Sequence, residues 1–204
     1  MTRIKKITQV THNKHLNYYE MVAENRNGKE FPYFMASRTD GTEDLYANTG
    51  VLHANGVNIC SIVKTPEGEK IVLICQYRYP LNNRIYEFPA GLVEKGEDAA
   101  EAGIRELYEE TGLKIDCIKP PTGYNRPFFN SCGMTDECNA TIFGYASGEV
   151  STAHLEASED LKVVLAGKAE ARRILAEENI ALNCAYMLMH FASCEEGHFF
   201  DFLK

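Results

Sequence analysis

Residues 91–113, GLVEKGEDAAEAGIRELYEETGL, combine many carboxylates with a single arginine. On a helix, side chains four residues apart project from the same face, so Glu106 and Glu110 would hold their carboxylates side by side. Like charges at this spacing destabilise a helix by about 0.2–0.5 kcal/mol unless something positive lies between them. A hard cation such as Mg²⁺, which takes oxygen ligands from carboxylates and substrate phosphates, would suit such a pair. The spacing therefore predicts a divalent-cation site.

Arg105 and Glu109 form a second pair four residues apart, of opposite charge and turned away from the first. We expect Arg105 to fasten the helix to the loop before it. The helix itself is predicted from about Asp98 to Thr111, because Gly112 stands in the usual position after a helix end. Taken singly, each glutamate would also suit an ordinary solvated helix face, so the interpretation depends on the whole pattern.

The segments around this helix predict a mixed α/β layer fold. Asn27–Gly28 divides 16–38 into two aromatic-rich runs and is a strong signal for a hairpin. A second hairpin of central strands is predicted over 57–79, where the apolar residues are nearly continuous. Further strands are predicted at 85–91, 113–120, 138–146 and 160–167, and amphipathic helices at 168–179 and 181–194.

Composition narrows the function classes. The chain has 204 residues, enough for one domain or one domain with a small appendage, and a net charge of −8. A basic face for nucleic acid is not expected from this balance. Seven cysteines without a CxxC pair, and no signal peptide, favour reduced thiols and a cytoplasmic location. We also expect no membrane span, since no run approaches about 20 apolar residues.

The complete spacing resembles the signature of the Nudix hydrolases. Gly91 and Glu97 precede Arg105–Glu106–Leu107, and Glu109–Glu110 and Gly112–Leu113 follow at the defined intervals. The resemblance implies an α/β/α sandwich with a mixed sheet. It implies a Nudix hydrolase domain over 46–204, preceded by an N-terminal antiparallel β-hairpin extension over 1–45 that could serve dimerisation.

The resemblance also implies roles for individual residues. Glu106 and Glu110, with the backbone carbonyl of Ala90, would bind Mg²⁺, for which Mn²⁺ could substitute. Glu109 would be a further ligand or catalytic residue, braced by Arg105. This agrees with the chemistry of a diphosphate, whose negative charge repels a nucleophile until metals neutralise it and orient water. A glutamate can then take the proton of that water.

Residues 75–97, CQYRYPLNNRIYEFPAGLVEKGE, resemble the segment that leads into the motif of ADP-ribose pyrophosphatases. The resemblance implies that Arg78 contacts the diphosphate and that Glu87 lines the site. An arginine at the end of a central strand is well suited to bidentate phosphate binding. The hairpin that ends in MASR would pack across a homodimer, with Arg38 and an aromatic near Tyr33 or Phe34 holding the nucleotide. Ordinary hairpin packing would also explain these aromatics.

Residues 130–137, NSCGMTDE, resemble the loop that commonly reads Ser-Pro-Gly in these enzymes. Gly133 then matches a substrate-binding position, whereas Cys132 replaces the proline. This departure weakens the ADP-ribose assignment but not the hydrolase assignment. Cys132 is not expected to be a nucleophile, because the metal scheme needs no thiolate.

Residues 154–164, HLEASEDLKVV, resemble the late loop that carries another glutamate into the site. Glu159 matches a distal metal ligand or general base, and Glu156 is the alternative base. Either glutamate would also suit an ordinary polar loop. We expect no chemical role for His154.

These observations predict Mg²⁺-dependent hydrolysis of ADP-ribose or a related nucleoside diphosphate sugar, giving AMP and ribose 5-phosphate from ADP-ribose. One alternative is a Nudix pyrophosphatase for dinucleotide polyphosphates or another nucleotide sugar. Another is a non-catalytic ADP-ribose sensor, which the retained Glu106, Glu109 and Glu110 disfavour. The expected partners are a small-molecule substrate and a second copy of the chain, with no nucleic acid and no membrane.

Overall fold

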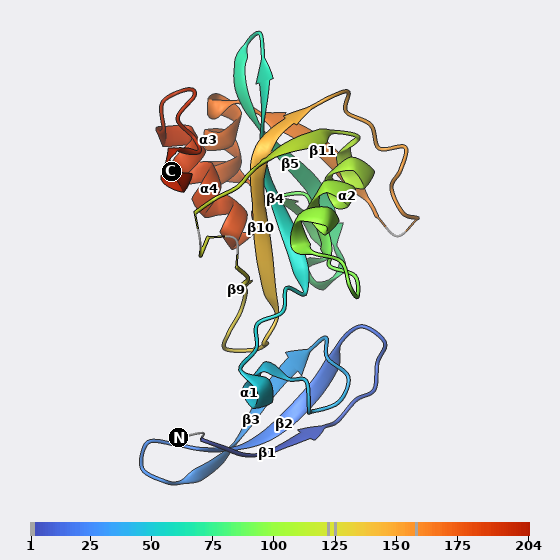
Figure 1. Cartoon of the computed structure of the whole chain (residues 1–204), viewed down its shortest axis with the longest axis vertical. Helices are drawn as coiled ribbons and strands as arrows, with labels where there is room; N and C mark the ends of the chain where they lie inside the picture. The colour runs from blue at the N-terminus through green and yellow to red at the C-terminus, as the bar shows by residue number, and fades with distance from the viewer. Residues whose placement is uncertain (1–2, 122, 125, 158) are drawn as a thin grey trace. The chain divides into compact units, whose positions relative to one another are not determined.

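The computed structural model describes residues 3–121, 123–124, 126–157 and 159–204. The chain forms two compact units (Figure 1). Unit 1 comprises residues 1–55 and 127–139, and unit 2 comprises 56–126 and 140–204. The compact units thus do not divide at residue 45, and the two-domain assignment made from the sequence stays a prediction.

Unit 1 is built on a three-stranded antiparallel sheet of β1 (Ile4–Gln9), β2 (Asn17–Glu24) and β3 (Glu30–Ser37). The predicted hairpin is β2–β3, and Gly28 supplies the positive φ of 79° that its turn needs. One face of the sheet buries Tyr19, Met21 and Met35 against Leu45. Strand β1 is not among the elements predicted from the sequence, because its lysines interrupt the apolar pattern of Ile4 and Ile7, which pack on this core.

Unit 1 also contains the short helix α1 (Tyr46–Thr49) and the short strand β9 (Phe128–Phe129). Strand β9 pairs with the first two residues of β10 and lies outside the strands that the sequence predicted. Two residues carry too little periodicity to be predicted as a strand.

The larger sheet has eight strands, and its central path runs β11-β5-β4-β10-β8. Its strands are β4 (Gly56–Thr65), β5 (Gly68–Arg78), β6 (Asn83–Glu87), β7 (Ala90–Leu92), β8 (Lys114–Ile118), β9, β10 (Cys138–Ser147) and β11 (Leu161–Ala166). Neighbours β4 and β10 start side by side, where Asn55 N–H donates to Cys138 O, so this pair runs parallel (Figure 1). The pair β4–β5 is antiparallel, and the sheet is therefore mixed.

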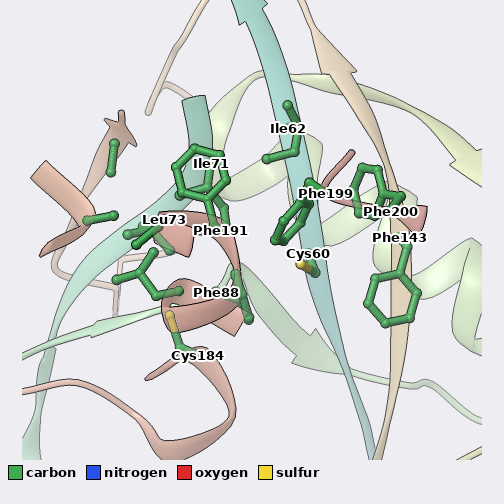
Figure 2. Packing of buried hydrophobic residues seen from close by; sticks show 14 of the residues in the cluster. Cys60, Ile62, Ile71, Leu73, Phe88, Phe143, Cys184, Phe191, Phe199 and Phe200 are labelled. Atoms are coloured by element: carbon green, nitrogen blue, oxygen red, sulfur yellow. The ribbon is translucent and has the colours of Figure 1, made fainter. Parts of the chain in front are cut away.

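Helices cover both faces of this sheet, which confirms the predicted α/β class. Helix α2 (Ala99–Thr111) lies on one face, while α3 (Lys168–Glu177) and α4 (Leu182–Ser193) lie on the other (Figure 1). Alternate residues of β4 serve the two cores: Ile59 packs with Leu107 and Leu113, whereas Cys60 and Ile62 pack toward α3 and α4. Figure 2 shows the core between the sheet and helices α3 and α4, in which Phe191 and Phe199 lie near Cys60 and Ile71. Burial on both faces explains the nearly continuous apolar sequence.

The single strand predicted over 85–91 is two strands. Strand β6 ends at Glu87 and β7 begins at Ala90, because Pro89 has no N–H to donate to a ladder. The carbonyl of Pro89 accepts instead from the N–H of Ile59, 2.8 Å away.

Short 3₁₀ helices occupy Tyr79–Leu81 and Asp201–Leu203.

All seven cysteines are free thiols, as expected from their odd number and apolar settings. In the described part of the chain, no helix combines the length and the apolar character that crossing a membrane requires.

Candidate active site

Helix α2 is closed at both ends by its own sequence. The Asp98 carboxylate accepts from the N–H groups of Ala100 and Glu101, at 2.7 and 2.9 Å. In turn, the Glu101 carboxylate accepts from the N–H of Asp98. This capping box satisfies donors that a helix start leaves without partners. Gly112 ends the helix with a φ of 73° and donates to Tyr108 O. The predicted limits of the helix are therefore confirmed.

Glu110 is the most deeply placed carboxylate of the helix, with only 1% of its surface exposed. One of its oxygens accepts a hydrogen bond from the N–H of Ala90, 3.0 Å away. Burial, reinforced by the charges of Glu159 and Glu106, raises the pKa of Glu110 to about 8. The Ala90 hydrogen bond and the charge of Arg78 oppose this shift of the pKa without cancelling it. Glu110 is thus a buried acid whose positive neighbour among the described residues, Arg78, offsets only part of the effect of burial.

Glu106 lies one turn before Glu110 and fills the space above Gly91. A Cβ added to Gly91 would lie 1.8 Å from Cδ of Glu106, so a side chain here would displace the carboxylate. Burial raises the pKa of Glu106, and the neighbouring Arg105 only partly offsets this. The glycine that opens the signature is therefore required by the close approach of a glutamate.

Arg105 ties the helix to the preceding loop. Its Nε and Nη2 donate to the two oxygens of Glu97, at 3.1 and 3.0 Å, and Nη2 also donates to Leu92 O. Its Nη1 donates to Glu106 at 2.8 Å and to Glu109 at 3.1 Å. The bond from Arg105 lowers the pKa of Glu97. These contacts agree with the fastening that the sequence spacing suggested, and they add Glu106 to it.

Arg78 ends β5 and lies within electrostatic reach of Glu110. Its Nε donates to the Glu87 carboxylate at 2.7 Å. Glu87 is the last residue of β6, which pairs antiparallel with β5 and places Glu87 opposite Ile74, so the ion pair draws the guanidinium back along the sheet and fixes its position. An arginine held in this way keeps further donors for an anionic ligand.

Glu159 comes close enough to α2 for its charge to raise the pKa of both Glu106 and Glu110. Within its own loop, the N–H of Glu156 donates to the Glu159 carboxylate at 2.8 Å, and the N–H of Glu159 donates to Glu156 O at 3.0 Å. The structure therefore brings Glu159, Glu106 and Glu110 into one electrostatic group.

No three acidic, histidine or cysteine side chains among the described residues are already gathered as metal ligands. The available donors nevertheless suit a hard cation, because they are oxygen atoms from Glu106, Glu110 and Glu159. Two of these carboxylates have raised pKa values caused by burial and mutual repulsion, which a bound cation would relieve.

Two predicted substrate residues, Arg38 and Gly133, belong to unit 1. Arg38 Nε donates to Glu137 at 2.6 Å, and Gly133 O accepts from the Tyr33 hydroxyl at 2.8 Å. A cavity of about 350 Å³ lies in the same unit, with mostly apolar and aromatic walls that include Cys132. Its lining residues include Met21, Tyr33, Met35, Tyr46, Phe129 and Met134.

Two contacts around Glu159 and α2 could not be predicted from the sequence. Arg84 Nη2 donates to Asp160 at 2.6 Å, directly beside Glu159. The ring of His154 stacks on Tyr108 of α2, with centroids 4.9 Å apart. Neither contact has a local signal, because each joins residues more than 40 positions apart in the chain.

Comparisons of the sequence and of the fold with known proteins all find Nudix proteins or hydrolases of ADP compounds among the similar chains. A family model described as "NUDIX domain" matches residues 54–179. The chain is 35% identical over 135 residues to an ADP-ribose pyrophosphatase of Saccharomyces cerevisiae, covering 63% of this chain and 55% of that protein. It is 34% identical over 99 residues to an ADP-sugar pyrophosphatase of Mus musculus, covering 48% and 45%. The chain thus spans about half the length of these curated relatives.

A relative from Bacillus methanolicus, a methanol dehydrogenase activator, is 32% identical over 72% of this chain and 76% of its own length. A solved structure described as an ADP compounds hydrolase has a TM-score of 0.58 and 17% identity, covering 85% of this chain and 82% of that one. At this identity, the structural likeness shows the fold alone.

Proposed function

Because the chain belongs to the Nudix family, we propose that it hydrolyses the diphosphate linkage of ADP-ribose or of a related nucleoside diphosphate sugar. From ADP-ribose the products would be AMP and ribose 5-phosphate. The observation that carries the proposal is the pair Glu106 and Glu110, two acids on one helix face whose pKa values are raised by burial. The pyrophosphatase names of the yeast and mouse relatives support the substrate class.

Nudix hydrolases generally use divalent metal ions. We propose Mg²⁺, with Mn²⁺ as a substitute, held by Glu106, Glu110, Glu159 and the Ala90 carbonyl. When bound, the cation would neutralise the diphosphate and acidify a water molecule. The raised pKa of Glu110 means that its carboxyl must lose a proton before it can serve as a ligand.

The remaining residues would bind substrate and handle the proton. Arg78, oriented by Glu87, would bind a phosphate oxygen at the end of β5. Glu159 would act either as the distal ligand of this cation or as the general base, because it is the loop glutamate whose charge reaches Glu106 and Glu110. Glu156 remains the alternative base, and its N–H orients the Glu159 carboxylate. Arg105 would hold both Glu106 and Glu109 in place.

Cys132, in the position of the usual proline, supports a second candidate within the same chemistry. A different loop there would favour another diphosphate, such as a dinucleotide polyphosphate or another nucleotide sugar. Substrate contacts of Arg38 and Gly133, a homodimer, a cytoplasmic location and the absence of nucleic-acid binding all stay predictions.

The decisive experiment measures AMP release from ADP-ribose, beside ADP-glucose and a dinucleotide polyphosphate, with and without Mg²⁺. Faster cleavage of ADP-ribose, lost in Glu110→Gln, would support the proposal. Cleavage of another diphosphate alone would replace the substrate but keep the hydrolase. Binding of ADP-ribose without turnover of any compound would contradict the enzyme and favour the sensor.

A further inference from the structure

The loop between β10 and β11 begins against the end of α2. Figure 1 shows this loop on the same side of unit 2 as the helix. The N–H of Ser151 donates to the carbonyl of Thr111, the last residue of α2, at 2.8 Å. The approach is so close that a Cβ on Gly112 would lie 2.8 Å from the backbone nitrogen of Ser151. The start of the loop is therefore held by the helix backbone.

The end of the loop is held by the sheet. Asp160 directly follows Glu159 and accepts from Arg84 Nη2 at 2.6 Å. The carbonyl of Asp160 also accepts from the N–H of Tyr77, 2.9 Å away, and from Arg84 Nη1. These bonds fix the backbone where β11 begins.

Between these two ends, the ring of His154 lies on the ring of Tyr108. Their centroids are 4.9 Å apart and their planes differ by 27°. Tyr108 lies three residues before Thr111, and His154 lies three residues after Ser151. The loop therefore runs back along the helix, toward the turn that carries Glu106.

We propose that Tyr108 and His154 are positioning residues, and that their ring stack holds the loop so that Glu159 stays beside Glu106 and Glu110. This inference rests on the proposed function of Glu159. It assigns a role to the residue between the fixed positions of the signature, Tyr108, and to a histidine for which the sequence predicted none. The stack is a side-chain contact between the two ends of the loop, whereas the bonds of Ser151 and Asp160 hold only those ends.

The first test needs no catalysis. Amide hydrogen exchange over 150–160 is measured in the metal-free protein for the wild type, Tyr108→Ala and His154→Ala. Loss of one aromatic contact should accelerate local opening of the loop by roughly threefold to tenfold. The variants Tyr108→Phe and His154→Phe keep a ring and should exchange like the wild type. Tyr186→Ala, which removes an exposed tyrosine from α4, is the matched control.

The second test is kinetic and uses the best diphosphate substrate. In Tyr108→Ala and His154→Ala, kcat should fall about tenfold or more, because a base or ligand displaced by an ångström loses most of its effect. KM should change by less than about twofold, since Arg78, the proposed phosphate ligand, is untouched. Tyr108→Phe should recover the wild-type kcat.

Unchanged exchange in both alanine variants would overturn the inference, as would Tyr108→Phe exchanging as fast as Tyr108→Ala. Faster exchange with unaltered kcat would show that the stack holds the loop but does not position a reacting group, which also contradicts the proposal. If the wild type hydrolyses no diphosphate, the proposed function fails, and the exchange data alone then decide whether the stack holds the loop.

Discussion

The backbone N–H of Ala90 donates a hydrogen bond to the carboxylate of Glu110, 3.0 Å away in the interior of unit 2. This bond joins the first residue of β7 to the last turn of α2. It gives a buried acid one donor, while burial and two nearby glutamates keep its pKa at about 8. A carboxyl in this setting makes both folding and ligand binding depend on pH.

Stability of the metal-free protein should fall as pH rises. Because the pKa of Glu110 is raised from its ordinary 4.5 to about 8, the folded state binds more protons than the unfolded chain between these values. The stabilisation is fully present below pH about 4.5 and is lost as pH approaches about 8, with a slope of up to about 1.4 kcal/mol per pH unit.

Urea unfolding with EDTA at several pH values measures this slope. Glu110→Gln should remove most of it, and Glu177→Gln, which changes an exposed glutamate of α3, should leave it unchanged. Equal slopes in the wild type and Glu110→Gln would contradict the prediction.

Addition of Mg²⁺ or Mn²⁺ should raise the unfolding temperature. A ligand that binds only the folded state stabilises it by about 2.7 kcal/mol at one hundred times its Kd. We expect this shift in thermal scans of the wild type and its absence in Glu106→Gln and Glu110→Gln. The Glu177→Gln variant should respond like the wild type. A full shift in Glu110→Gln would place the cation elsewhere.

Gly91→Ala should abolish most activity without unfolding the protein. The new Cβ would lie within about 2 Å of the Glu106 carboxylate, whose flexible side chain can move away. Glu106 would then leave its position, and a loss of roughly a hundredfold in kcat is expected. Gly167→Ala is the control, because its Cβ would meet nothing within 4 Å. A Gly91→Ala variant with wild-type kcat would show that the position of Glu106 does not matter.

Arg105→Ala should destabilise the protein and lower kcat together. It removes the bonds to Glu97, Glu106 and Leu92 O, and about 1–2 kcal/mol of stability is expected from partly exposed charge-assisted bonds. Arg105→Lys should recover only part of this, because an ammonium lacks the planar fork.

The comparison variant is Arg173→Ala, which breaks ion pairs around α3 to carboxylates more exposed than Glu97 and Glu106, which Arg105 binds, and which should cost less stability. Urea midpoints and kcat measured in parallel test both statements. An Arg105→Ala midpoint equal to that of the wild type would mean that the tie between helix and loop is dispensable.

The sequence alone determined the features that depend on near neighbours. The limits of α2 follow from Asp98 and Gly112, which act within four residues of themselves. The shared face of Glu106 and Glu110 follows from the period of a helix, and the β2–β3 hairpin follows from its Asn-Gly turn. The signature also indicated the family, since all its fixed positions lie within one segment of 23 residues.

Only the tertiary structure decided the features that join distant segments. The depth of Glu110 depends on the burial of α2 against the sheet, and its pKa depends on Glu159, almost 50 residues later. The pairs Arg84–Asp160 and Tyr108–His154 likewise arise from strand order and loop course. Residue spacing records what a single element can bring together, whereas burial and long-range contacts exist only after the elements have packed.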